Sequence, residues 1–157
     1  RSDSSPVVVA TDISDLALEL AAQNRGRIEC RATLELRQGS WWEALDPTEA
    51  GRITLVVSNP PYVSRADWET LDPLVKDHDP MVALVAQDGR GGEPGFSEIE
   101  KILIGAPIWL GRPAAAVVEI APALAEPALE VARRCGARGV VMNDLAGRPR
   151  ALVARFA

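Results

Sequence analysis

The ten residues ITLVVSNPPY, at positions 53–62, decide how this chain can fold. A largely apolar, β-branched run, Ile53–Ser58, stops abruptly at Asn59 and two prolines. This pattern predicts a buried strand whose carboxyl end opens into a loop, which is where open α/β sheets bind their ligands. The prolines fix φ and lack N–H groups, so the loop is stiff and its carbonyls have few local partners. With the aromatic Tyr62 behind them, they favour a site for an amide-bearing group over a simple strand-ending turn.

Composition and charge limit the class of protein. The 157 residues are 47% hydrophobic and 25% charged, which is typical of one globular domain. Proteins that bind nucleic acid typically carry an excess of positive charge, whereas this chain has a net charge of −5. Direct nucleic-acid binding is therefore disfavoured. No long apolar segment or signal peptide is recognisable, which predicts a soluble, cytoplasmic protein. Cys30 and Cys135 match no metal-ligand or redox spacing, so we expect free thiols, with Cys135 buried, and no metal.

A second strand end precedes this loop in the chain. The run Val7–Thr11 ends at Asp12, and a helical pattern then begins at Ser14 and stops at Gly26. Asp12 should face the same crevice as Asn59, where an acid of a nucleotide-binding α/β unit accepts hydrogen bonds from both ribose hydroxyls. The alternative is that Asp12 only caps the helix.

The spacing before Asp12 is shorter than a complete nucleotide-binding unit requires. The glycine-rich loop of such units stands about 20 residues before the acid. Only eleven residues precede Asp12, and none is glycine. We therefore expect the loop that cradles the cofactor, and the strand leading into it, to lie upstream of Arg1.

Three motifs carry a resemblance to a known family. Asn-Pro-Pro-Tyr after a strand resembles the signature of S-adenosylmethionine-dependent methyltransferases that act on adenine, cytosine or glutamine amide nitrogens. The segment Val75–Leu84, with His78-Asp79-Pro80 inside it, and the turn Asp144–Arg150 are similar to stretches of the HemK-type protein-glutamine methyltransferases. That family modifies peptide chain release factors. His78 is the chain's one histidine, and we assign it no catalytic role.

The resemblance implies an α/β fold of the Rossmann-like class I methyltransferase type, a doubly wound, mostly parallel sheet with a terminal antiparallel hairpin. The implied strand order is 3-2-1-4-5-7-6, with the central strand 1 missing from this chain. The strands that begin near Val7 and Thr54 should therefore not pair. Residues 1–157 would form one N-terminally incomplete catalytic domain.

The resemblance also implies the reaction and its residues. A methyl group would pass from S-adenosylmethionine to the side-chain amide of a glutamine in the Gly-Gly-Gln loop of a release factor. Asn59 and Pro60 would accept the two amide hydrogens, Pro61 would shape the slot, and Tyr62 would lie on the planar amide. Asp12 would bind the cofactor ribose, and Asn59 would also face the cofactor.

Trp41 has two interpretations. It follows the predicted strand Thr33–Arg37, and either it belongs to the core or it forms a wall for the cofactor adenine. In the family, the preceding position is usually an acid that binds the adenine amino group. Here that position holds Ser40, a weaker acceptor.

The remaining segments complete the expected fold. The glycine-rich stretch Asp88–Gly95 predicts a loop near the site mouth, which is either a substrate lid or merely a long connection. A helix should follow from Phe96 until Pro107 ends or kinks it. A buried strand, a helix and two antiparallel strands are expected at 114–120, 127–134, 139–143 and 150–156. Two other functions stay open: a DNA or RNA amino-methyltransferase acting on a flipped base, and a non-catalytic remnant without the cofactor loop.

Overall fold

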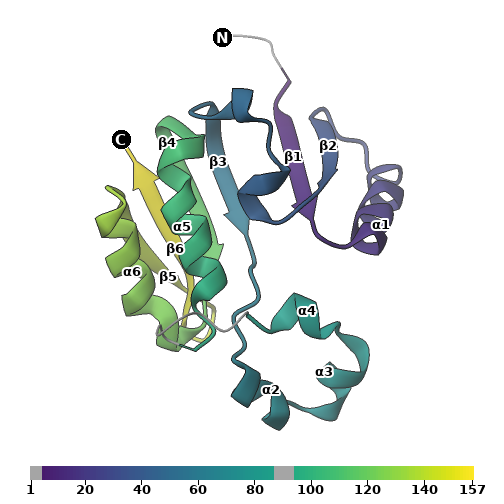
Figure 1. The fold of residues 1–157 in the computed structure, drawn as a ribbon, viewed down its shortest axis with the longest axis vertical. Coiled ribbons are helices and arrows are strands. Elements are labelled where there is room, and N and C mark those ends of the chain that lie inside the picture. The colour runs from purple at the N-terminus through teal and green to yellow at the C-terminus, as the bar shows by residue number, and fades with distance from the viewer. Residues whose placement is uncertain (1–4, 87–93) are drawn as a thin grey trace. The chain divides into compact units, whose positions relative to one another are not determined.

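The computed structural model describes residues 5–86 and 94–157 (Figure 1). The chain divides into two compact units, Arg1–Thr48 and Glu49–Ala157, and each is described here by itself. The expectation of one catalytic domain over 1–157 stays a prediction. Most of the predicted loop Asp88–Gly95 lies outside the described residues.

The first unit is a strand–helix–strand motif. Strand β1 (Val7–Asp12) leads into helix α1 (Asp15–Arg25), which returns the chain to strand β2 (Thr33–Gln38). β1 and β2 pair in parallel, in a continuous register from Val7 opposite Thr33 to Asp12 opposite Gln38. Two short 3₁₀ helices follow, η1 (Trp41–Ala44) and η2 (Pro47–Glu49). The strand, helix and strand predicted from the sequence are confirmed.

The ends of α1 follow from its capping residues. The Ser14 hydroxyl accepts a hydrogen bond from the backbone N–H of Ala17, at 3.3 Å, and the N–H of Gly26 bonds to the carbonyl of Ala22. The apolar stripe of this helix is nonetheless exposed: no residue of α1 is buried, and Leu16 is 76% exposed.

The second unit contains a four-stranded sheet in the order β3 (Ile53–Ser58), β4 (Leu110–Glu119), β6 (Pro149–Phe156), β5 (Arg138–Asn143). β3 and β4 are parallel, whereas β6 runs antiparallel to both β4 and β5. The implied strand order is reproduced within each sheet, because β2-β1 and β3-β4-β6-β5 correspond to 3-2 and 4-5-7-6. β1 and β3 belong to separate sheets, as expected. The predicted fold class is confirmed.

The core lies on one face of this sheet. Helices α5 (Ser97–Trp109) and α6 (Ala125–Arg134) lie side by side over β4, β6 and β5 (Figure 1). Their apolar residues bury against alternate residues of the strands, as a half-covered sheet requires. The fully buried side chains include Ile99, Ile102, Leu103, Val118, Leu152 and Phe156.

Two local expectations were wrong, and a third holds only in part. α5 continues past Pro107 to Trp109, so the proline does not end the helix, and a kink there stays a prediction. β3 is not a buried strand: it is the outermost strand of its sheet, and Leu55 and Val57 are 56% and 72% exposed. Cys135 is half-buried, at the end of α6, and its thiol is free.

Three short helices, α2 (Arg65–Thr70), α3 (Pro73–His78) and α4 (Met81–Leu84), lie between β3 and α5, and the 3₁₀ helix η3 (Pro122–Leu124) precedes α6. None of the helices in residues 5–86 and 94–157 has the length and apolar character needed to cross a membrane.

Candidate active site

The loop after β3 presents one polar side chain beside a buried proline. Asn59 is exposed, Pro60 is fully buried, and Pro61 and Tyr62 are half-buried. The Asn59 side chain makes no hydrogen bond to any residue that the structure describes, so its carbonyl and amino groups are available to a ligand. Burial of Pro60 and the fixed φ of both prolines hold the backbone on which Asn59 stands.

The chain beyond Tyr62 is tied to the family-like segment Val75–Leu84. Val63 forms a parallel bridge with Val85. Its N–H donates to the carbonyl of Leu84 at 2.9 Å, and its own carbonyl accepts from Ala86 at 3.0 Å. The segment that the resemblance singled out therefore ends beside the Asn-Pro-Pro-Tyr loop.

Gly95 packs directly against Tyr62. It has a φ of +80°, and a Cβ placed on it would overlap the carbonyl oxygen of Tyr62. Both its backbone conformation and this close approach require glycine. The sequence marked this region as glycine-rich, but it gave no sign of the contact with Tyr62.

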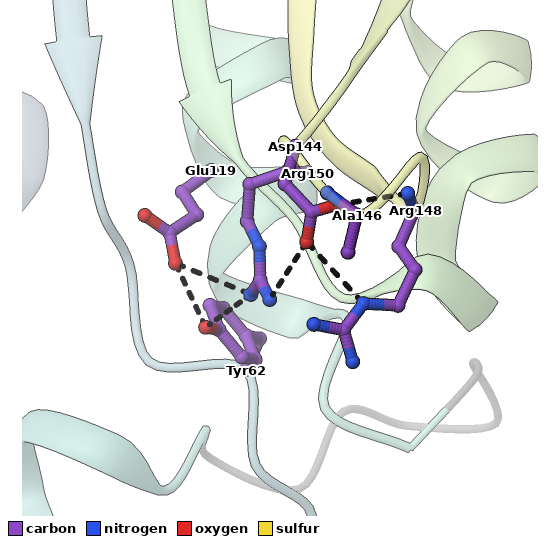
Figure 2. A network of polar contacts seen from close by, with 6 residues as sticks. All are labelled: Tyr62, Glu119, Asp144, Ala146, Arg148 and Arg150. Atoms are coloured by element: carbon purple, nitrogen blue, oxygen red, sulfur yellow. Dashed lines mark hydrogen bonds and ion pairs between the residues drawn. The ribbon is translucent and has the colours of Figure 1, made fainter.

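The Tyr62 hydroxyl, in the loop after β3, contacts charged residues of strands β4 and β6 (Figure 2). It donates a hydrogen bond to Oε1 of Glu119, the last residue of β4, at 2.9 Å. Nη1 of Arg150, near the start of β6, lies 3.4 Å from the hydroxyl and 3.7 Å from the same carboxylate oxygen. Burial, then the hydrogen bond to Glu119 and its negative charge, raises the pKa of Tyr62, while Arg150 opposes the rise.

Asp144 organises the turn that carries Arg150. Its Oδ1 accepts the backbone N–H groups of Ala146 and Arg148, at 2.8 and 2.9 Å. Its Oδ2 lies 3.3 Å from Nε of Arg148 and 3.8 Å from Nη2 of Arg150. The Arg148 N–H bond, followed by the Ala146 N–H bond and the two guanidinium charges, holds the pKa of Asp144 below its usual value. Figure 2 shows these side chains converging beside Tyr62.

Asp12 and Trp41 belong to the first unit. Asp12 is exposed at the end of β1, and its Oδ1 accepts the N–H of Ser14 at 2.8 Å. Ser14, not Asp12, is the N-cap of α1, so the helix-cap alternative for Asp12 is wrong in that form. Trp41 begins η1, is half-buried, and has a φ of +48°, an uncommon value for a residue other than glycine. Their cofactor roles stay predictions.

The sequence missed Glu119 and the role of Arg150. A charged residue at a strand end is ordinary, and Glu119 stands 57 positions from Tyr62. Arg150 was noted only as the end of a family-like turn. The register of β4 with β6 brings Glu119 and Arg150 together beside Tyr62. This register cannot be predicted from the sequence around either residue.

Comparisons with known proteins agree with the motifs. No protein-family model matches the chain. It is 32% identical over 151 residues to the release factor glutamine methyltransferase of Synechocystis sp., covering 95% of this chain and 48% of that protein. It is 38% identical over 113 residues to the ribosomal protein uL3 glutamine methyltransferase of Bordetella pertussis, covering 72% and 35%.

A solved structure supports the fold. The crystal structure of a methyltransferase from Pyrococcus furiosus matches with a TM-score of 0.62 at 17% identity, covering 95% of this chain and 61% of that one. The chain spans about half the length, or less, of the curated relatives it matches. The resemblance read from the sequence is thereby confirmed: over almost all of its length this chain is similar to part of the release factor glutamine methyltransferases, and it has a methyltransferase fold.

Proposed function

We propose that the protein containing this chain transfers a methyl group from S-adenosylmethionine to the side-chain amide nitrogen of a glutamine in the Gly-Gly-Gln loop of a peptide chain release factor. The observation that carries the proposal is the exposed, unbonded Asn59 side chain beside the fully buried Pro60, with the ring of Tyr62 two residues further along the chain. The similarity to release factor glutamine methyltransferases supports the choice of substrate.

The residues of the loop suit this chemistry. An amide nitrogen is a poor nucleophile, because its lone pair is delocalised into the carbonyl. The Asn59 side-chain oxygen and the Pro60 carbonyl would accept the two amide hydrogens, which orients the nitrogen and places negative dipoles where positive charge develops. Such positioning is worth about 7–11 kcal/mol, and electrostatic preorganisation adds to it.

When bound, S-adenosylmethionine would supply the methyl group from its sulfonium, and the sulfur would keep the bonding electron pair as the amide nitrogen, held by Asn59 and Pro60, forms the new N–C bond. The nitrogen then loses one proton to water. Tyr62 would lie on the planar amide and exclude water from the slot. The Tyr62 phenol is neutral at physiological pH, since its pKa is raised further above an ordinary value that is already well above neutrality.

Asp12 and Trp41 fit the cofactor by the chemistry of their side chains. An exposed carboxylate at a strand end can accept hydrogen bonds from a ribose diol, even with Oδ1 shared with the Ser14 N–H. A half-buried indole offers an apolar wall to adenine. We place the reaction in the cytoplasm, where release factors act.

A second protein substrate shares this chemistry. The similarity to a ribosomal protein uL3 glutamine methyltransferase favours a glutamine of that protein as the alternative. A nucleic-acid base is disfavoured by the net charge of −5.

The test is methyl transfer from tritiated S-adenosylmethionine by the full-length protein. Release factor, uL3 and duplex DNA are offered in parallel, together with a release factor whose Gly-Gly-Gln glutamine is replaced by alanine. We expect label on the intact release factor only. Label on uL3 alone would move the assignment to the second substrate, and label on DNA alone would overturn the proposal.

A further inference from the structure

The hydroxyl of Tyr62 does more than stacking requires. A ring that only lies on a planar amide could be a phenylalanine. Here the phenol donates a 2.9 Å hydrogen bond to Glu119, from a loop to the end of a strand elsewhere in the sheet. Hydrogen bonds to ionised acceptors are roughly twice as strong as neutral ones, so this bond is a firm constraint on the ring.

The backbone of Tyr62 is fixed on both sides. Pro61 precedes it, Val63 is bridged to Val85, and Gly95 lies against its carbonyl. With the backbone held, two side-chain torsions remain to place the ring. The hydroxyl bond to Glu119 restrains the first torsion directly, because the oxygen lies at the far end of the rigid ring. The oxygen also lies on the axis of the second torsion, so the bond restrains the ring plane through the preference of a phenol O–H to lie in that plane.

The antiparallel strand β6 explains why a charge pair stands at this point. Glu119 is opposite Ala151, and the N–H of Ile120 bonds to the carbonyl of Arg150 at 2.9 Å. The start of β6 therefore lies beside the carboxyl end of β4. The Arg150 guanidinium lies 3.7 Å from Glu119 and 3.8 Å from Asp144, which places one positive charge between two carboxylates.

We propose that Glu119 and Arg150 are positioning residues for methyl transfer: Glu119 holds the Tyr62 ring in the orientation that receives the substrate amide, and Arg150, steadied by Asp144, holds Glu119. This inference rests on the proposed function. It assigns the terminal hairpin a part in the active site, through the turn residue Asp144 and through Arg150, the second residue of β6.

The first test needs no activity. Tyr62 is the one tyrosine of this chain, so ¹³C-labelled tyrosine gives a ring signal that the Tyr62→Phe variant assigns by its loss. Glu119 and Arg150 are the charged groups of the described residues that face the phenol. Glu119→Gln should lower the pKa of Tyr62, because a negative neighbour is lost. Arg150→Met should raise it, because a positive neighbour is lost.

Matched controls come from the same elements. Arg155→Met removes an exposed arginine of the same strand, β6. Arg155 lies five residues beyond Arg150, or roughly 16 Å along the strand. Glu130→Gln removes an exposed carboxylate of α6. Both should leave the pKa of Tyr62 unchanged. If neither Glu119→Gln nor Arg150→Met changes the pKa of Tyr62, the proposed contacts of Tyr62 with Glu119 and Arg150 are wrong.

The second test is a double-mutant cycle in the full-length protein. Tyr62→Phe and Glu119→Ala remove the same hydrogen bond, so each should lower turnover about tenfold and the double variant should be no slower than either. Glu119→Gln keeps an acceptor and should restore most of the rate. The KM for the cofactor should not change, whereas a loss of general stability would alter it and would lower the melting temperature.

The outcomes separate the two proposals. If the wild-type protein transfers no methyl group to release factor or uL3, the proposed function fails, while the pKa responses still decide the network. If transfer occurs but the Tyr62→Phe and Glu119→Ala effects multiply to about a hundredfold, the two residues act independently and the positioning role is wrong.

Discussion

The two units of this chain are built from similar patterns but differ in burial. The buried apolar residues of the described chain all lie in the second unit, and apart from Pro60 they fall between Ala86 and Phe156. In the first unit, β1 and α1 have the expected patterns, yet Val7 and Leu16 are 63% and 76% exposed. An apolar stripe is therefore sufficient to predict a helix or strand, but burial depends on a partner element to cover the stripe.

The largest expected difference between the units is in stability. Leu103→Ala removes a fully buried side chain of α5 and should lower the free energy of unfolding by about 2–5 kcal/mol. Leu16→Ala makes the same change on the exposed face of α1 and should change it by less than about 0.5 kcal/mol. Denaturant melts of both variants measure the difference. Equal losses would show that α1 is covered in solution.

The next effect concerns chemistry in the second unit. Asn59→Ala should lower turnover by about 10²–10³-fold with little change in cofactor binding, because the lost acceptor acts on charge that develops during transfer. Asn59→Asp keeps an acceptor but adds charge and removes the amide donor, so it should also be slow. Single-turnover rates, with folding checked by thermal melts, test both variants. A near-normal rate for either one would leave Asn59 as a turn residue.

The smallest effect concerns the first unit. Asp12→Ala in the full-length protein should weaken S-adenosylmethionine binding by at least about tenfold, or about 1.4 kcal/mol, through loss of the ribose contacts. The melting temperature without cofactor should stay close to that of the wild type, since Asp12 is exposed and only its bond to Ser14 is lost. Calorimetric titration measures the affinity. An unchanged affinity would restrict Asp12 to the turn before α1.

Much of the fold could be predicted because its helices and strands depend on short-range patterns in the sequence. The β-branched run before Asn59, the cap at Ser14 and the glycine after α1 each report on neighbours within a few residues. The strand order within each sheet came from the family resemblance, since no periodicity carries it. The end of α5, two residues past Pro107, has no comparable short-range signal.

The site was predicted only in its local part. The motif Asn59–Tyr62 is four consecutive residues, so it is visible in the sequence. Glu119 and Gly95 reach Tyr62 through strand register and loop closure, and both are long-range properties. A glutamate after a valine pair, or one more glycine in a glycine-rich stretch, has nothing in its own neighbourhood to distinguish it.

The bridge between Val63 and Val85 has a consequence for how such proteins can diverge. The chain leaves the Asn59–Tyr62 loop at Val63 and comes back beside it at Val85, so α2, α3 and α4 form an excursion closed at its base by two hydrogen bonds. The entropic cost of closing such an excursion rises only slowly with its length. Insertions, deletions or exchanges between Arg65 and Leu84 can therefore remodel the surface next to the loop while Asn59 and Tyr62 stay in place. In a grafting experiment, Val63 and Val85 are the two splice points at which this excursion can be replaced as one piece.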